Sequence, residues 1–323
     1  MSGSVSRTSG YNSAVKFPAF LLLLPVLGGA QNLTEESIVV GGLTRTYRYY
    51  APSEPGGSLP LVIVLHGAGG ASESMPGVTH FDQLAAEQGF IVVFPDGFEK
   101  HWNDLRGIPE WSAQQRNVDD VGFISALIDR FITQHNADPA RVFVTGISNG
   151  GLMSHRLGCE LAGKIAAIAP VVRTLTTRLS DQCKPVRPIS VLMFFGTADK
   201  LVPFGGGIQK MGSVETPVLS AQETIERWAF LNGCSNNPEV TKTTRPPGSR
   251  QVFASCRQGV EVVAYIREGA GHKWPEDATA LIWAFFKKHP MPRAQAAPSR
   301  GLQPPTAARL VSIVGKSPTP KAR

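Results

Sequence analysis

The sequence predicts an α/β fold in which helices cover both faces of a mostly parallel central sheet. Short apolar runs without polar interruption recur along the chain, as expected for strands buried on both faces of a parallel sheet. Stretches with helical spacing of apolar residues separate these runs, and strands alternating with helices form such sheets. The runs are Leu61–Leu65, Phe90–Phe94, Val142–Val144, Ile165–Ala169, Val191–Phe195 and Val262–Ile266.

The remaining elements follow in order. A hairpin over residues 38–51 leads into the first buried strand through a loop rich in Pro, Gly and Ser. Apolar residues at helical spacing predict helices over residues 81–88, 119–134, 149–161, 221–231 and 278–288. Together these elements predict one folded domain over residues 31–290, since the chain is long enough for a single large α/β domain.

The charge of the chain is concentrated at its ends. The net charge is +7, but residues 1–30 and 291–323 together carry eight Lys and Arg and no acid. Residues 31–290 hold the other 24 cations and all 25 acids, so the domain is close to neutral. A nucleic-acid-binding function therefore loses its main support.

Both ends are expected to lie outside the folded domain. Residues 1–30 have the pattern of a signal peptide: a cationic start, an apolar stretch over 17–27 that is too short to span a bilayer, and small residues before Ala30. An uncleaved membrane anchor is the alternative. Residues 291–323 are rich in Pro, Ala, Ser and Arg, which predicts a disordered tail. We expect a secreted protein, extracellular or periplasmic, without a stable membrane anchor.

The chain has four cysteines, a number that is consistent with export. An even number in an exported chain predicts two disulfides, for which three pairings are possible. Pairing neighbours closes the shortest loops and is our prediction: Cys159 with Cys183, and Cys234 with Cys256. The alternative is four buried free thiols. No Cys or His spacing suggests zinc, so no metal site is expected.

The run Gly146-Ile147-Ser148-Asn149-Gly150 carries the chemistry. A Gly-x-Ser-x-Gly motif alone is weak, but this one follows a predicted strand and precedes a helix-forming stretch. That is the setting of a nucleophile elbow, in which a tight turn requires Gly on both sides of the Ser. Ser148 is therefore the candidate nucleophile, at the N-terminus of a helix where negative charge is favoured.

A serine nucleophile needs a base, and the base needs an orienting acid. In the α/β-hydrolase fold they follow the Ser in the order acid, then His. His272 lies directly after the last strand and is the candidate base, in preference to His155 and His289. Asp199 lies directly after the preceding strand and is the candidate acid, in preference to two other loop carboxylates, Asp181 and Asp277.

The negative oxygen formed when a serine nucleophile attacks a carbonyl group needs backbone N–H donors. Asn149, directly after the nucleophile, should supply one. The Gly-rich segment after the first buried strand, His66-Gly67-Ala68-Gly69-Gly70, should supply the other, from Ala68 in the first place and Gly67 next. The alternative for this segment is an ordinary turn at a strand end.

At these residues the chain resembles the polyhydroxybutyrate depolymerase-like esterases, which are related to the feruloyl and acetyl-xylan esterases of carbohydrate esterase family one. The resemblance covers about residues 36–290. It rests on His66–Gly70, Pro95-Asp96-Gly97, Trp102-Asn103, Val118–Phe123, Gly146–Gly151, Gly196–Asp199 with Val202-Pro203, and Gly271–Pro275. It implies an α/β-hydrolase fold, export, ester hydrolysis through Ser148, Asp199 and His272, and a site without metal or cofactor.

The resemblance leaves the substrate open. Three aromatic residues near the predicted site, Trp102, Phe204 and Trp274, could contact an aryl, sugar or aliphatic ester, or could pack against neighbouring loops. We expect a small-molecule or oligomeric ester, such as a hydroxyalkanoate oligomer or a feruloyl or acetyl ester. Two other functions stay open: an exported serine peptidase, and an exported binding protein of the same fold without catalysis.

Overall fold

The computed structural model describes residues 1, 3, 32–53, 56–235 and 237–292. Almost all of the expected signal peptide and the expected tail lie outside these residues. Met291, which we assigned to the tail, is buried and its amide donates to the carbonyl of Ala140 at 2.7 Å. The packed chain therefore extends slightly beyond residue 290.

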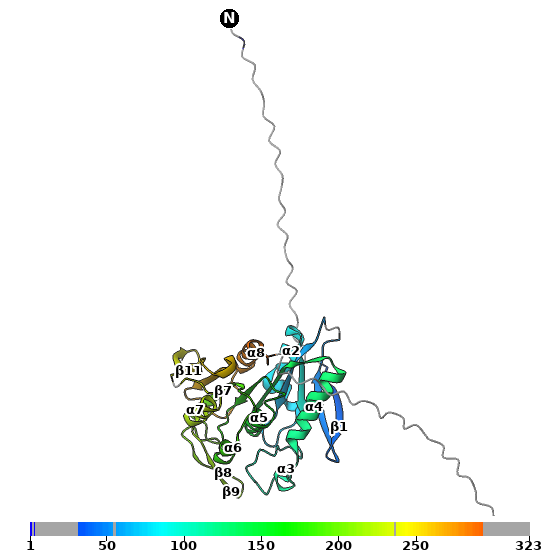
Figure 1. Ribbon diagram of the computed structural model, residues 1–323, viewed down its shortest axis with the longest axis vertical. Coiled ribbons are helices and arrows are strands. Elements are labelled where there is room, and N and C mark those ends of the chain that lie inside the picture. The colour runs from blue at the N-terminus through cyan, green and yellow to red at the C-terminus, as the bar shows by residue number, and fades with distance from the viewer. Residues whose placement is uncertain (2, 4–31, 54–55, 236, 293–323) are drawn as a thin grey trace, which may run out of the picture.

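A mixed sheet of ten strands forms the centre of the molecule (Figure 1). Its spatial order is β1-β2-β4-β3-β5-β6-β7-β12-β11-β10, and the six strands from β4 to β12 in this order run parallel. The strands are β1 (Thr34–Val40), β2 (Leu43–Tyr50), β3 (Leu59–Leu65), β4 (Ile91–Pro95), β5 (Ala137–Ile147), β6 (Ala167–Val171), β7 (Ser190–Gly196), β10 (Glu239–Thr244), β11 (Pro247–Phe253) and β12 (Val262–Arg267).

Helices pack on both faces of this sheet because the side chains of each buried strand alternate between two apolar clusters. In β3, Ile63 joins the cluster that contains residues of α4, α5 and α7, whereas Val62 and Val64 join the cluster that contains residues of α2 and α8. The helices are α1 (Met75–Thr79), α2 (Phe81–Gln88), α3 (Ser112–Gln115), α4 (Asp120–Gln134), α5 (Asn149–Glu160), α6 (Thr177–Gln182), α7 (Ala221–Leu231) and α8 (Ala278–Lys288).

The sequence prediction of the central elements is confirmed, with two kinds of difference. The strand predicted over Ile165–Ala169 begins two residues later, as β6, because the amide of Ile165 still bonds to the carbonyl of Leu161 in the preceding turn. The prediction omitted the small hairpin β8 (Gly207–Met211) and β9 (Val214–Val218), the last two strands on one side of the sheet, β11 and β10, and the short helices α1, α3 and α6. These elements carry few apolar residues, so no buried run marks them.

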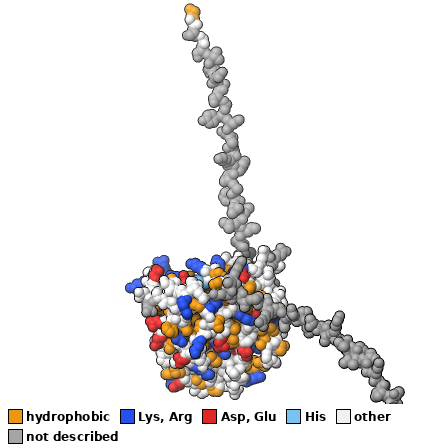
Figure 2. All heavy atoms as spheres, viewed as in Figure 1, with side chains coloured by type: hydrophobic (Ala, Val, Ile, Leu, Met, Phe, Trp, Pro, Cys, Tyr) orange, Lys and Arg blue, Asp and Glu red, His pale blue; other side chains and the backbone are white. Residues whose placement is uncertain are grey.

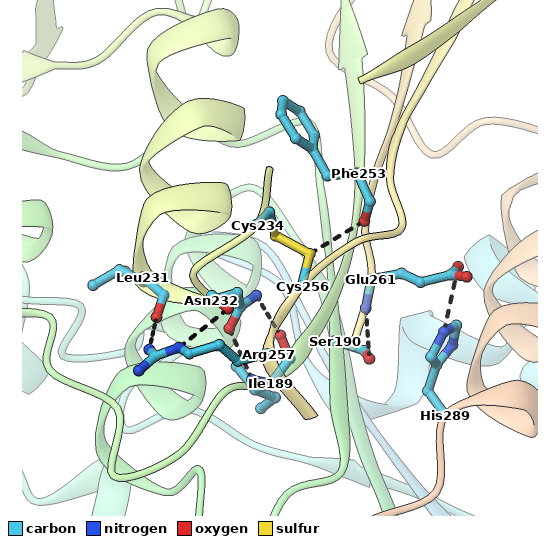
Figure 3. The surroundings of a disulfide bond; sticks show 10 residues. All are labelled: Ile189, Ser190, Leu231, Asn232, Cys234, Phe253, Cys256, Arg257, Glu261 and His289. Atoms are coloured by element: carbon cyan, nitrogen blue, oxygen red, sulfur yellow. Dashed lines mark hydrogen bonds and ion pairs between the residues drawn. A yellow bond between two sulfur atoms is a disulfide. The ribbon is translucent and has the colours of Figure 1, made fainter. Parts of the chain in front are cut away.

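The two disulfides pair as predicted. Cys159 in α5 is bonded to Cys183 after α6, and Cys234 after α7 is bonded to Cys256 before β12. Figure 3 shows the second bond together with Asn232, whose side chain exchanges two hydrogen bonds with the backbone of Ile189, at 2.9 and 2.8 Å. The disulfide thus joins the end of α7 to the segment that leads into β12, and Asn232 ties the same end of α7 to the segment that enters β7.

Charged side chains of both signs are interspersed with apolar ones on the face of the molecule shown in Figure 2. This pattern is ordinary for a globular surface. In the part of the chain that the structure describes, no helix has the length and hydrophobicity needed to cross a membrane.

Candidate active site

Ser148 lies in a sharp turn between β5 and α5. Its backbone has φ 58° and ψ −112°, a strained conformation for a residue with a side chain. Its amide donates to the carbonyl of Val171 at 3.1 Å, so the turn is tied to the end of β6. The turn is possible because Gly flanks it: a Cβ at Gly146 would lie 2.6 Å from the carbonyl oxygen of Gly150, and one at Gly150 would lie 2.5 Å from that of Leu65.

Asp199 and His272 meet at the same edge of the sheet. Asp199 follows β7, His272 follows the adjacent β12, and His272 Nδ1 lies 2.7 Å from Asp199 Oδ2. The other carboxylate oxygen, Oδ1, accepts from the amides of Leu201 and Val202, both at 2.9 Å. The carboxylate is therefore fixed in orientation, and its contact with Nδ1 leaves Nε2 of His272 for another partner.

The ionisation of Asp199 follows from these contacts. Burial acts to raise the pKa of its carboxyl group. The hydrogen bonds from His272 and from the amides of Val202 and Leu201 outweigh that effect, so the pKa is lowered below its ordinary value. Asp199 is thus an anion at neutral pH, which suits it to stabilise a protonated imidazole.

The Gly-rich segment after β3 is held by His66. The amide of Gly97 donates to His66 Nε2 at 2.8 Å, so the ring proton is on Nδ1, which donates to the carbonyl of Gly67 at 2.7 Å. Burial lowers the pKa of His66 and keeps it neutral. The amides of Gly69 and Gly70 donate to Lys100 and Gly67 carbonyls. The segment is a fixed structure rather than a free loop, and Ala68 at its tip is exposed.

Trp102 is buried, which favours the packing alternative over substrate contact for this residue. Its side chain is fully buried, and its indole Nε1 donates to the carbonyl of His66 at 3.0 Å. Its amide donates at 2.9 Å to the side-chain oxygen of Asn149, the residue after Ser148. Trp102 therefore ties the Gly-rich segment to the start of α5. The sequence could not separate a buried Trp with a satisfied N–H from an exposed one.

A buried ion pair between Asp104 and Arg106, which the sequence did not predict, holds the side chain of Asn149. The side-chain amide of Asn149 donates to Asp104 Oδ2 at 2.5 Å. Asp104 also accepts from Arg106, with Nη2 to Oδ2 at 2.6 Å, and from Gln114 at 2.8 Å. The only hint in the sequence was the proximity of Asp104 to the Trp102-Asn103 motif. Since all these groups are buried, the network fixes the first turn of α5.

The other two aromatic candidates differ from each other. Trp274 is about nine-tenths buried, packs edge-on against Phe81, and donates from its indole to Thr279 at 3.0 Å. These contacts favour a packing role. Phe204 is half-buried and lines a small cavity together with Asp199. Phe204 thus stays a candidate for substrate contact.

The structure brings only some of the candidate catalytic residues into contact. Within the described residues, no hydrogen bond joins Ser148 to His272. The histidines set aside are committed elsewhere: His155 is fully buried against Trp228, and His289 binds the carbonyl of Phe285. Asp277 pairs with Arg267. No group of three or more His, Cys, Asp or Glu side chains in the described ranges is arranged to hold a metal ion.

Comparison with known proteins gives matches of three kinds. A family model described as Esterase PHB depolymerase matches residues 45–173. The chain is 31% identical over 264 residues to the protein named "Putative esterase NocK" of Nocardia uniformis subsp. tsuyamanensis, covering 75% of this chain and 74% of that protein. It is 30% identical over 236 residues to feruloyl esterase B of Piromyces equi, covering 72% of this chain but 42% of the length of that enzyme.

A solved structure of acetyl xylan esterase from Aspergillus awamori has a similar fold. Its TM-score is 0.57, and the match covers 79% of this chain and 99% of that one. The sequence identity is 15%, so this likeness concerns the fold alone.

The strand order, with Ser148 after β5, Asp199 after β7 and His272 after β12, defines an α/β-hydrolase, as the sequence predicted. The matches narrow this class further. The chain belongs to the esterase PHB depolymerase family, which groups it with carboxylic ester hydrolases and confirms the resemblance stated above.

Proposed function

We propose that this protein is a secreted serine esterase that cleaves carboxylic esters through Ser148, His272 and Asp199. The contact of 2.7 Å between His272 Nδ1 and Asp199 Oδ2 carries the proposal. It occurs at the same edge of the sheet as the strained turn that presents Ser148. Structural ion pairs of this kind also occur, but here the order Ser, Asp, His and the positions after β5, β7 and β12 match the requirements of acyl transfer.

In the proposed mechanism the Ser148 hydroxyl attacks the ester carbonyl while His272 Nε2 takes its proton. The tetrahedral intermediate collapses to an acyl-enzyme, and His272 gives the proton to the leaving alcohol. Water then attacks the acyl-enzyme with His272 again as base, which releases the acid and restores Ser148. Asp199 stabilises the imidazolium in both steps, and its lowered pKa keeps it ionised.

Two amides are proposed to bind the oxyanion. Asn149 begins α5, and the first N–H groups of a helix have no partner within it. Ala68 lies between Gly67 and Gly69 at the exposed tip of the Gly-rich segment, next to the Ser148 turn: a Cβ at Gly67 would lie 3.5 Å from that of Ser148. The hydrogen bonds of Trp102 to both segments would hold the two amides at a fixed separation.

The substrates we propose are soluble aryl or short-chain esters, such as feruloyl or acetyl esters, or hydroxyalkanoate oligomers. The names of the relatives and of the family model support these classes. Two disulfides support an oxidising compartment and hence secretion.

Replacement of the nucleophile tests the proposal. Ser148→Ala should lower the hydrolysis of 4-nitrophenyl acetate at least about 1,000-fold, because no acyl-enzyme can form. Ser154→Ala is a matched control, since Ser154 lies on the same helix and its hydroxyl donates to the carbonyl of Gly150 instead. Activity of Ser148→Ala close to that of the unchanged protein would disprove the assignment.

Two other functions predict different results. A peptidase would share the triad, so a peptide amide cleaved faster than the matching ester would favour it. A binding protein without catalysis would not react at Ser148 with a fluorophosphonate probe. Mass spectrometry of the labelled protein distinguishes this case, because the proposed esterase should carry the probe on the peptide that contains Ser148.

A further inference from the structure

Arg173 is a buried cation next to the nucleophile turn. It lies two residues after Val171, whose carbonyl accepts from the amide of Ser148. The residue between them, Val172, has φ 46°, a strained conformation for a β-branched side chain. Arg173 itself is 1% exposed, and its Cβ lies so close to the first turn of α5 that a Cβ at Gly151 would be 2.9 Å away.

The guanidinium of Arg173 is only partly bonded. Nη1 donates to the side-chain oxygen of Gln209 in β8 at 2.8 Å, and Gln209 in turn donates to the carbonyl of Leu201 at 2.8 Å. Nε and Nη2 of Arg173 have no hydrogen-bond partner among the described residues, and neither has the buried hydroxyl of Thr174. Buried donors without partners destabilise a fold, so groups of this kind call for a ligand or a function.

Arg173 and Thr174 both line a small cavity beside Asp199. The cavity is lined by Val172, Arg173, Thr174, Phe195, Gly196, Asp199, Val202 and Phe204. Its volume of about 10 Å³ is enough for one water molecule and too small for a substrate group. A water needs two to four polar partners, which Arg173 and Thr174 supply.

The charges around Arg173 come from several elements. Burial lowers its pKa to about 9 and the cation of Arg106 acts in the same direction, whereas the carboxylates of Asp104 and Asp199 oppose the shift. Arg173 therefore stays protonated at neutral pH. His272 contacts Asp199 from the loop after β12, and the ring of His155 in α5 lies against the carbonyl of Arg173.

We propose that Arg173 is a positioning residue for the pair Asp199 and His272. With Thr174 it binds one water molecule in the cavity beside Asp199, and its positive charge adds to the hydrogen bonds that orient Asp199 and opposes protonation of the pair. The inference rests on the proposed function, because it assigns to Arg173 a role in preparing the base that activates Ser148.

The pH dependence of kcat/KM for 4-nitrophenyl acetate tests the proposal. Arg173→Met removes the charge but keeps an unbranched apolar chain. Without the cation, the pair Asp199 and His272 binds a proton more readily, so the acidic limb should move to higher pH by about half a unit or more. At the plateau, kcat should fall about tenfold.

Arg187→Met is the matched control for loss of a buried cation. Arg187 is 9% exposed, and its guanidinium bonds to the carbonyls of Pro188 and Ile165. It precedes β7, at the opposite edge of the sheet from Asp199. Arg187→Met should lose stability but keep the acidic limb of the unchanged protein. An Arg173→Met profile that coincides with that of Arg187→Met would overturn the proposal.

Two further variants keep the test decisive if Arg173→Met does not fold. Arg173→Lys restores the charge and should return the acidic limb to its original position. Thr174→Val removes only the hydroxyl from the cavity and should lower kcat about threefold or more through loss of the water. An unchanged kcat in Thr174→Val, or a shifted limb in Arg173→Lys, would contradict the proposed role.

Failure of this inference is distinguishable from failure of the proposed function. If Ser148 is not the nucleophile, the unchanged protein will not take up a fluorophosphonate at Ser148. If only the role of Arg173 is wrong, labelling at Ser148 will be normal and the pH profile of the Arg173→Met variant will not shift.

Discussion

At the scale of single residues, His155 links the nucleophile helix to the stability of the fold. It lies in α5, is fully buried, and accepts at Nδ1 from the indole of Trp228 at 2.9 Å. Nε2 then carries the proton and faces the carbonyl of Arg173 at 3.3 Å. Burial lowers the pKa of His155 to about 3. The folded protein therefore holds this ring neutral at pH values where the unfolded chain would protonate it.

The stability of the protein should depend on His155 between its two pKa values. The unfolded chain binds a proton near pH 6.5 and the folded protein only near 3, so the free energy of unfolding should fall as pH decreases through this range. The slope is at most about 1.4 kcal/mol per pH unit. In His155→Gln this contribution disappears. Urea unfolding of both proteins from pH 8 to 4 should show converging stabilities below pH 6, and parallel curves would contradict the assignment.

Residue types and their order predicted which side chains could take part in catalysis, but they did not predict which side chains are buried. Ser148, Asp199 and His272 were predicted as candidates because each follows a predicted strand, and strand order brings Asp199 and His272 into contact. The sequence left open whether Trp102 contacts substrate or packs, because its hydrogen bonds run to His66 and Asn149, which are distant in sequence. Arg173 was not found at all, since only the fold shows that a charged residue after β6 is buried.

At the scale of elements, the turn between β5 and α5 should tolerate no side chain at its flanks. A Cβ at Gly146 would meet backbone atoms of Gly150 at 2.6 and 2.7 Å, which cannot move without breaking the turn. Gly146→Ala should therefore lower the free energy of unfolding by about 2–3 kcal/mol and abolish esterase activity. Gly77→Ala in α1 is the control: a Cβ there meets nothing within 4 Å, so stability should stay equal or rise. A stable, active Gly146→Ala would contradict this account.

The strands that could be predicted from the sequence are those buried on both faces of the sheet, because such burial makes their residues apolar throughout. β3 and β7 read as uninterrupted apolar runs because each packs against helices on two faces. β10 is almost wholly exposed at the edge of the sheet, and β8 has one buried residue in five. Such strands form through backbone pairing to a neighbour, which leaves no periodic signal in their own residues.

At the scale of the whole molecule, the two disulfides close loops of nearly equal length but lie in different surroundings. The bonded residues are 24 and 22 positions apart, so restriction of the unfolded chain should contribute about 3 kcal/mol in each case. Cys159 and Cys183 are buried in the core, whereas Cys234 and Cys256 are partly exposed. Because the two loops are nearly equal in length, a difference in stabilisation between the two disulfides reports the contribution of packing and not that of chain entropy.

Paired alanine variants measure this difference. Loss of either cross-link should lower the free energy of urea unfolding by about 3 kcal/mol, and Cys159→Ala with Cys183→Ala should lose more than this because a core cavity adds to the lost cross-link. In the intact folded protein, a mild reductant should open the exposed pair first, which mass spectrometry after thiol alkylation detects as label on Cys234 and Cys256. Earlier labelling of Cys159 and Cys183, or an equal loss of stability in both variants, would show that burial does not govern these bonds.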